Sequence, residues 1–249
     1  MMNQLYIKSA AVCCPDSKVL AAFNLQGSDI DKSLIPAGMR RRTSVTTRIA
    51  ITAAKLACVQ ADVGTQNLAS IFASLGGEIQ VTDALCRLLP DKNELLSPTQ
   101  FHNSVHNTTA GYWSILNQCQ APATAIAAAD DTFAMGLIEV WAQLQQSSGE
   151  RLLVCYDELW PQYLTPPIGK IAFACAFVLS AEPDQSIGAI TLPQVSQQKE
   201  QALQADWVKL TKAAPAAAVI PLLLALQHKQ PCIVPLNIKV PIWTSLLEV

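Results

Sequence analysis

Residues 122–141 read PATAIAAADDTFAMGLIEVW, a short apolar segment that ends in two acids and then continues in a helical pattern. Residues 123–129 are small, uncharged and too few for a helix, which predicts a strand buried inside a sheet. After the two acids, apolar residues recur at spacings of three and four: Phe133, Leu137, Trp141 and Leu144. This spacing predicts one helix with a wide apolar face, so Asp130 and Asp131 lie at a strand-to-helix turn.

Many α/β enzymes hold a nucleophile at such a turn, because the helix N-terminus directs N–H groups and partial positive charge toward it. Here the turn carries carboxylates, which are weak nucleophiles toward thioesters. Asp130 or Asp131 is therefore expected to cap the helix, as aspartate commonly does. The alternative is a general base whose pKa is raised at a buried turn.

The composition indicates one large domain with a partly apolar surface. The chain has 249 residues, of which 51% are apolar and 14% charged. This low charge leaves apolar surface for a partner subunit. A net charge of −2 gives no electrostatic reason to expect binding to nucleic acid or an anionic membrane.

Eight cysteines lie scattered through the chain without a CxxC pair. This pattern is typical of buried thiols in a reducing compartment. No signal peptide is recognisable, and the longest apolar stretch, residues 213–226, contains two prolines and is too short to span a bilayer. We therefore expect a cytoplasmic protein without a membrane span.

The rest of the chain alternates strand and helix patterns. Predicted strands cover residues 5–13, 68–74, 152–156, 171–179 and 187–192. Predicted helices begin after Ser44 and near Asn107 and cover residues 80–89, 207–212 and 216–228, the last with a proline break. Residues 233–249 contain several prolines and resist assignment. This order predicts a layered α/β domain in which helices cover a mostly buried sheet.

A second informative segment, residues 97–116, reads SPTQFHNSVHNTTAGYWSIL. Ser97 and Pro98 predict a turn, and the residues to Asn103 favour a loop. His102 and His106 are four apart, a spacing that can hold a metal on a helix, but no acidic or cysteine ligand accompanies them locally. We therefore predict no metal site, and no nucleotide-binding or serine-hydrolase motif occurs that would imply a cofactor.

The two segments together resemble the N-terminal half of the β-ketoacyl synthases, the thiolase-fold condensing enzymes. The family pattern of the type SP..F.....N..AG..SI is matched by Ser97, Pro98, Phe101, Asn107, Ala110, Gly111, Ser114 and Ile115. The preceding residues IPAGMRRRTSVTTRIA resemble the family's arginine-rich entry to its first long helix. The resemblance implies an α/β, thiolase-like layered fold in one domain, residues 1–249. Residues 1–194 would form the core N-terminal ketosynthase half, and residues 195–249 a much reduced C-terminal half.

The family's active-site cysteine falls on Asp130, so the resemblance implies no catalytic residue. The two family histidines and the FGFGG-type loop are also missing from the sequence. In this the chain is similar to chain length factors, inactive homologues that pair with an active ketosynthase, and most of all to the aryl polyene type. The implied partners are an active β-ketoacyl-ACP synthase and, through that complex, an acyl carrier protein. No cofactor is implied.

The resemblance also assigns candidate residues to the partner interface and its acyl tunnel. They are Gln100, Phe101, His102, Ser104, Val105, His106, Asn107, Ala125, Ile126, Ala127, Asp131 and Phe133. The strand at 123–129 would align with the partner's strand across a two-fold axis, and Gln100, Phe101, Ser104 and Val105 would line the far end of the partner's tunnel. Alternatively, Phe101 is a core residue, and His102 and His106 only form hydrogen bonds at the interface.

Other functions stay open at this stage. A stand-alone thiolase-fold enzyme could use Asp130 or Asp131 with His106 for decarboxylation or thioester hydrolysis. A ligand-binding module has only the apolar surface in its favour. The cluster Arg40, Arg41 and Arg42 is expected to be a solvated helix entry, with contact to an anion or an acidic carrier protein as the alternative.

Overall fold

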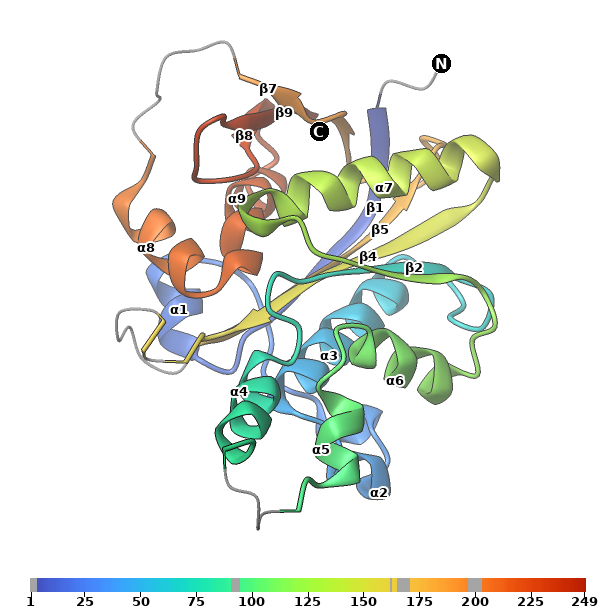
Figure 1. The fold of residues 1–249 in the computed structure, drawn as a ribbon. Coiled ribbons are helices and arrows are strands. Elements are labelled where there is room, and N and C mark those ends of the chain that lie inside the picture. Colours follow the sequence, from blue (N-terminus) through green and yellow to red (C-terminus); the bar gives the residue numbers. More distant parts are fainter. Residues whose placement is uncertain (1–3, 91–94, 162, 165–170, 197–202) are drawn as a thin grey trace.

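The computed structural model describes residues 4–90, 95–161, 163–164, 171–196 and 203–249. In this part of the chain, nine strands form one mixed sheet with helices on both faces (Figure 1). The strands are β1 (Gln4–Cys13), β2 (Ala69–Ala73), β3 (Ala123–Ile126), β4 (Glu150–Glu158), β5 (Ala172–Ser180), β6 (Gly188–Thr191), β7 (Gln194–Val195), β8 (Cys232–Pro235) and β9 (Trp243–Glu248). Their order in the sheet is β3-β2-β4-β5-β1-β6-β9-β7, with β8 paired to β9.

The helices form two layers. They are α1 (Ser17–Ala22), α2 (Ala37–Arg40), α3 (Val45–Gln60), α4 (Ile79–Leu88), α5 (Pro98–Asn103), α6 (Thr108–Asn117), α7 (Thr132–Gln146), α8 (Ala205–Ala213) and α9 (Ile220–Gln227). Short 3₁₀ helices are η1 (Lys32–Leu34), η2 (Ala129–Asp131) and η3 (Pro215–Val219). Helices α3 and α6 pack on one face of the sheet, while α7, α8, η3 and α9 pack on the other (Figure 1).

The sheet centre is apolar on both faces because both faces are covered. In β4, Leu152 and Val154 join the cluster on the α3 side, whereas Leu153 and Cys155 join the cluster on the α7 side. This alternation follows from the two-residue period of a strand. A continuous apolar run is therefore the expected sequence of such a strand.

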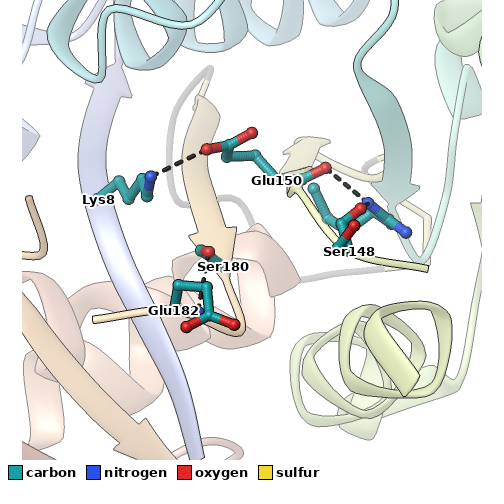
Figure 2. A network of polar contacts seen from close by, with 6 residues as sticks. Lys8, Ser148, Glu150, Ser180 and Glu182 are labelled. Atoms are coloured by element: carbon teal, nitrogen blue, oxygen red, sulfur yellow. Dashed lines mark hydrogen bonds and ion pairs between the residues drawn. The ribbon is translucent and has the colours of Figure 1, made fainter. Parts of the chain in front are cut away.

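Strand β1 contains a β-bulge at Lys8, whose side chain reaches past β5 to β4. The register of β1 against β5 shifts between Ile7 and Ser9, which leaves Lys8 as the extra residue. Its Nζ lies 2.9 Å from Oε1 of Glu150 on β4, so the ion pair spans β5 (Figure 2). This ion pair lies where β4 begins, at the end of the sheet opposite the carboxyl ends of the parallel strands.

The carboxyl ends of strands β1, β2, β3 and β4 lie at the same end of the sheet. Strand β2 pairs parallel with β3 and β4, and β5 runs antiparallel to both β4 and β1. In open α/β sheets, functional groups gather outside the carboxyl ends of the strands. The candidate functional residues are therefore expected at this end of the sheet.

The structure confirms all five strands predicted outside residues 123–129, as well as the long helix capped by Ser44, whose hydroxyl accepts from Thr47 N–H. Helices α4, α6, α7, α8 and α9 also match their predictions. The prediction for residues 123–129 is wrong in two respects, since β3 ends at Ile126 and lies at the edge of the sheet with partly exposed residues. Small apolar residues suit a buried strand and an edge that a partner covers equally well.

The unassigned C-terminal residues belong to the same sheet and the same core. Strands β8 and β9 form a hairpin that joins the sheet at β6, and Val234, Leu236 and Leu247 are buried in the cluster on the α7 side. Alternation was hidden in this segment by prolines such as Pro235 and Pro241. The boundary between a core half and a remnant at residue 194 stays a prediction.

The cysteines and hydropathy match the sequence-based picture in part. All eight cysteines are free; Cys86 is exposed, Cys232 is half-buried and the others are buried. Among the described residues, no helix has the length and apolar character needed to cross a membrane.

Candidate functional site: an edge strand and its turn

Strand β3 leaves one row of backbone groups unpaired. Ser70 N–H donates to Pro122 O at 3.0 Å and Ser74 N–H to Ile126 O at 3.1 Å, so the even-numbered residues of β3 face β2. Because successive residues of a parallel strand face opposite sides, Ala123, Ala125 and Ala127 direct their N–H and C=O groups away from the sheet. In the described part of the chain, β3 pairs with β2 alone.

Apart from its short length of four residues, this edge lacks the features that usually protect an edge strand. Native edges carry lysines, prolines, bulges or a covering loop, because unpaired strands recruit other chains. The segment ATAI carries no charge and no proline, and its first three side chains are small. A neutral, unpaired edge of this kind is suited to pairing with another strand.

The turn after β3 is strained at Ala129. Its φ of 49° places a non-glycine residue in the left-handed region, and η2 then leads directly into α7. Thr132 stabilises the turn, because its Oγ1 accepts from Ala128 N–H at 3.0 Å and donates to Ala129 O at 2.7 Å. The residue held in the strained conformation thus ends in a methyl group and offers no nucleophile.

The cap prediction for the two acids is confirmed for the position of Asp131 and wrong for the capping hydrogen bond. Asp131 occupies the N-cap position of α7, but its side chain makes no capping hydrogen bond. Its Oδ1 accepts from Asn237 Nδ2 at 2.7 Å, and Asp130 Oδ2 lies 3.1 Å from Lys239 Nζ. Both carboxylates therefore bind the loop between β8 and β9, which folds against the turn.

Asn237 fixes the shape of that loop. Its Nδ2 also donates to Lys239 O and Pro241 O, and its Oδ1 accepts from Trp243 N–H at 3.0 Å. The Asp130 side chain keeps 35% of its surface exposed, so the premise of a fully buried acid at this turn is also wrong. A salt bridge and an amide hydrogen bond therefore join the turn to this loop.

The segment around Phe101 is helical, which corrects the expected loop. Ser97 caps α5 by accepting from Gln100 N–H, and Pro98 occupies the first turn, where its missing N–H costs no hydrogen bond. Phe101 is 62% exposed and Val105 45% exposed, so the alternative that Phe101 is a core residue is wrong. Gln100, His102 and Asn107 are exposed as well.

Two side chains, Asn103 and His106, anchor this segment to its neighbours, and Ser104 bonds within it. Asn103 Nδ2 donates to Arg42 O, and its Oδ1 accepts from Tyr112 Oη at 3.0 Å. Ser104 Oγ donates to Phe101 O at 2.8 Å, which occupies its hydroxyl hydrogen. His106 Nε2 lies 2.8 Å from Ser74 O, and its ring packs against Gly77, where a Cβ would come within 3.1 Å of Cδ2.

The two histidines do not share a site. The ring of His102 meets Tyr112 edge-to-face with centroids 6.2 Å apart, while His106 bonds the end of β2. No group of three or more histidine, cysteine, aspartate or glutamate side chains suited to a metal is present in the described residues.

Ser74 connects the two candidate segments. Its carbonyl bonds His106, and its N–H bonds Ile126 at the end of β3. His106 and the end of β3 therefore both form a hydrogen bond with the Ser74 backbone. Phe133 lies inside α7 instead, where it stacks on Phe177 at a centroid distance of 6.0 Å and is 3% exposed.

A buried carboxylate near the end of β4 links the residues that follow β2 to the C-terminal segment. Asp157 Oδ1 accepts from Ser74 Oγ, Leu75 N–H and Gly76 N–H at 2.7–3.1 Å, and Oδ2 accepts from Ala216 N–H at 2.9 Å. Burial raises the pKa of Asp157 to about 6, despite these hydrogen bonds, which favour the charged form.

Two further carboxylates lie near Asp157. Burial raises the pKa of Glu158 to about 7, and the charges of Glu78 and Asp157 add to the effect. Burial also raises the pKa of Glu78, against hydrogen bonds from Ser44, Thr47 and Thr109. Beside Glu158 opens a mainly apolar cavity of about 580 Å³. It is lined by Pro15, Asp16, Val45, Gln80, Glu158, Leu159, Trp160, Pro161, Ile171 and Ala172.

Sequence analysis did not identify the residues that connect the carboxyl ends of the strands and the turn after β3 to the C-terminal segment. Asp157 stood in a segment without periodicity, and Asn237 and Lys239 stood among the unassigned prolines. Ser74 was expected only as the end of a strand. A signal was present for Asp157 alone, as a charged residue directly after an apolar strand.

The sequence itself matches one family model. Residues 17–234 match the N-terminal domain of β-ketoacyl synthases. No curated protein matches the sequence.

Three solved structures share the fold. A chain of the ketosynthase ApeO in complex with its chain length factor ApeC, from Xenorhabdus doucetiae, superposes with a TM-score of 0.70 at 20% identity, covering 99% of both chains. The ishigamide ketosynthase/chain length factor gives 0.70 at 11% identity, again covering 99% of both chains. The AntDE:AntF complex, a type II polyketide synthase acyl carrier protein with its ketosynthase, gives 0.72 at 11% identity and full coverage of both chains. The prediction of a thiolase-like layered α/β fold is confirmed.

Proposed function

The chain belongs to the β-ketoacyl synthase family, and on that premise we propose that it is a non-catalytic chain length factor. It pairs with an active β-ketoacyl-ACP synthase and shapes the partner's acyl tunnel while an acyl carrier protein delivers the growing chain. Aryl polyene synthesis is the specific system that we propose. The partners named for the structural relatives, a ketosynthase and an acyl carrier protein, support this assignment.

The observation that carries the proposal is the unpaired edge of β3. Its outward N–H and C=O groups need a hydrogen-bonding partner or water, and its small neutral side chains allow close approach of a second backbone. In an antiparallel pair about a two-fold axis, the partner's strand would continue the sheet through both chains. Ala125 and Ala127 would then donate and accept across the interface.

The turn supports a role without catalysis. Ala129 occupies its strained position, Asp130 pairs with Lys239 and Asp131 with Asn237. The alternative of a stand-alone enzyme needs Asp130 and His106 to act together, but each side chain is engaged with a different neighbour. Acyl transfer to the enzyme would have no nucleophile here.

The exposed residues of α5 and of the turn after it are the proposed tunnel residues. Phe101 and Val105 present apolar side chains to solvent, which a partner subunit would cover. Gln100 lies beside them, whereas the Ser104 hydroxyl already donates within the segment. Replacing Phe101 by alanine should lengthen the products of the complex and replacing it by tryptophan should shorten them, as measured by mass spectrometry. Val59→Ala, at an exposed position on α3, is the matched control and should change nothing.

Co-expression of the tagged chain with an untagged ketosynthase from the same organism tests the proposal. Size exclusion with mass spectrometry should show a one-to-one complex. Ala125→Pro should abolish it, because proline removes an outward N–H without touching a bond to β2, while Ala125→Ser should preserve it. A stable one-to-one complex with the proline variant would contradict the assignment.

Asp130→Ala separates the two candidate functions. The chain length factor assignment predicts that the complex keeps its condensation activity, which depends on the partner's cysteine. Turnover by the isolated chain that disappears in this variant would instead establish the stand-alone enzyme.

A further inference from the structure

One stripe of α7 flanks the open edge of β3. Residues Met135, Glu139, Ala142 and Gln146 recur at spacings of three and four, so they share one helix face, and none of them is buried. Gln143, next to this stripe, donates from Nε2 to Thr124 Oγ1 on β3 at 3.3 Å. The stripe therefore lies on the side of α7 that faces β3, and we call β3 and this stripe together the β3 face.

Glu139 is the only charge on the stripe. Its Oε1 accepts from the same Gln143 Nε2 at 2.8 Å, which places the carboxylate two hydrogen bonds from Thr124. Within the described ranges no lysine or arginine forms an ion pair with it. Arg151 on β4 contacts the end of α7, but its guanidinium donates to the Gln143 and Ser147 carbonyls rather than to the Glu139 carboxylate.

The sequence around the β3 face offers no cation to oppose it either. No lysine or arginine occurs between residues 95 and 149, a span that includes β3, α6 and α7. The acids in this span are Asp130, Asp131 and Glu139. Because Asp130 binds Lys239 and Asp131 binds Asn237, Glu139 alone keeps its charge free for a partner.

A second copy of this chain fits the β3 face poorly. In an antiparallel pair of β3 strands about a two-fold axis, the strands lie about 5 Å apart and the two α7 helices lie on the same face of the joint sheet. The two Glu139 carboxylates would then lie on the same face of the joint sheet, without a cation from either span. For two like charges about 10 Å apart, repulsion weakens association by about two- to sixteenfold at low salt, over effective dielectric constants from about 80 to about 20, and by less at high salt.

We propose that Glu139 selects the partner of the β3 face. The face accepts a different chain that presents a lysine or arginine opposite Glu139, and it disfavours a second copy of this chain. The inference rests on the proposed function, since it assumes that β3 is the pairing edge. It adds the reason for a heterodimer and the charge of the partner's surface.

The first experiment needs only the isolated chain. Sedimentation velocity at 20 mM and 500 mM NaCl compares the wild type with Glu139→Gln and with Asp62→Asn, which removes the same charge at an exposed position on α3's C-terminal side. Glu139→Gln should self-associate at least about twofold more tightly at 20 mM NaCl, with a smaller difference at 500 mM, while Asp62→Asn should match the wild type. Adding Ala125→Pro should abolish the gained dimer. Equal self-association of wild type and Glu139→Gln at low salt, as monomers or as dimers, would overturn the proposal.

The second experiment uses the co-expressed ketosynthase. Glu139→Lys should weaken the complex at least tenfold, and unchanged affinity would overturn the proposal. If the ketosynthase fails to bind even the wild type, the proposed function fails, while the comparison of self-association still decides whether Glu139 opposes pairing at β3.

Discussion

Replacing Asp157 by asparagine should change how stability depends on pH. The wild-type carboxylate accepts four hydrogen bonds, from Ser74, Leu75, Gly76 and Ala216, yet burial still raises its pKa from 3.8 to about 6. A folded-state pKa above the unfolded value means that the folded chain binds the proton more tightly. The corresponding stability is fully present below pH 3.8 and is lost as the pH rises through 6.

The magnitude follows from the size of the shift. One pKa unit corresponds to 1.36 kcal/mol, so a shift of about two units corresponds to about 3 kcal/mol in total. Linkage places about 2 kcal/mol of this loss between pH 4.5 and pH 7.5. Asp157 is 2% exposed, so solvent screens the effect little.

Urea unfolding followed by tryptophan fluorescence measures the effect. The free energy of unfolding of the wild type should fall between pH 4.5 and pH 7.5 by about 2 kcal/mol more than that of Asp157→Asn, because Glu78 and Glu158 titrate in both proteins. Asparagine also turns a donor toward Ala216 N–H, which lowers stability by about 1–3 kcal/mol at every pH and leaves the slope unaffected. Identical pH profiles of the two proteins would refute the assignment of a raised pKa to Asp157.

Other predictions concern packing, the loop and the thiols. Leu137→Ala on α7 should lower the free energy of unfolding by about 2–5 kcal/mol, because Leu137 is 1% exposed in the main core; urea unfolding would show a loss below 1 kcal/mol if that packing were wrong. Lys239→Met should cost less than about 1 kcal/mol, because the ion pair with Asp130 is largely exposed, and the difference should vanish in 0.5 M NaCl; a larger, salt-independent loss would contradict this. In the native chain Cys86 should react with a maleimide far faster than Cys155 or Cys175, which are buried in the sheet; equal labelling rates by peptide mass spectrometry would contradict the burial.

The central sheet could be predicted from sequence because its strands are buried on both faces. Apolar runs such as residues 171–179 have few other structures open to them in a layered α/β domain, and β5 matches closely. Helix α7 was equally predictable, since Phe133 and Leu137 repeat with the helical period and are buried. In these elements local pattern and tertiary packing agree.

The edge strand could not be placed, because side-chain pattern does not distinguish an interior strand from an edge that a partner covers. Residues 123–126 have the small apolar composition of either. The helix α5 was missed because its propensity is weak, whereas its stability comes from the Ser97 cap and the anchoring of Asn103. Local propensity therefore favoured a loop, whereas the cap and the tertiary contact of Asn103 stabilise a helix.

The contacts of the turn depend on chain segments far apart in sequence. Asp130 and Asp131 look like helix caps locally, but Lys239 and Asn237 reach them from the C-terminal hairpin. Likewise, Glu139 looks like an ordinary surface acid until Gln143 and Thr124 show which side of α7 it occupies. Such pairings require the folded topology.

Hydrogen exchange at β3 tests the central claim most directly. Mass spectrometry of peptides spanning residues 123–127 would compare the free chain with its complex with the ketosynthase. The outward amides of Ala123, Ala125 and Ala127 should exchange rapidly in the free chain and become protected in the complex. Protection elsewhere on the chain, with unchanged exchange at these amides, would contradict the account that β3 is the strand through which this chain joins its partner.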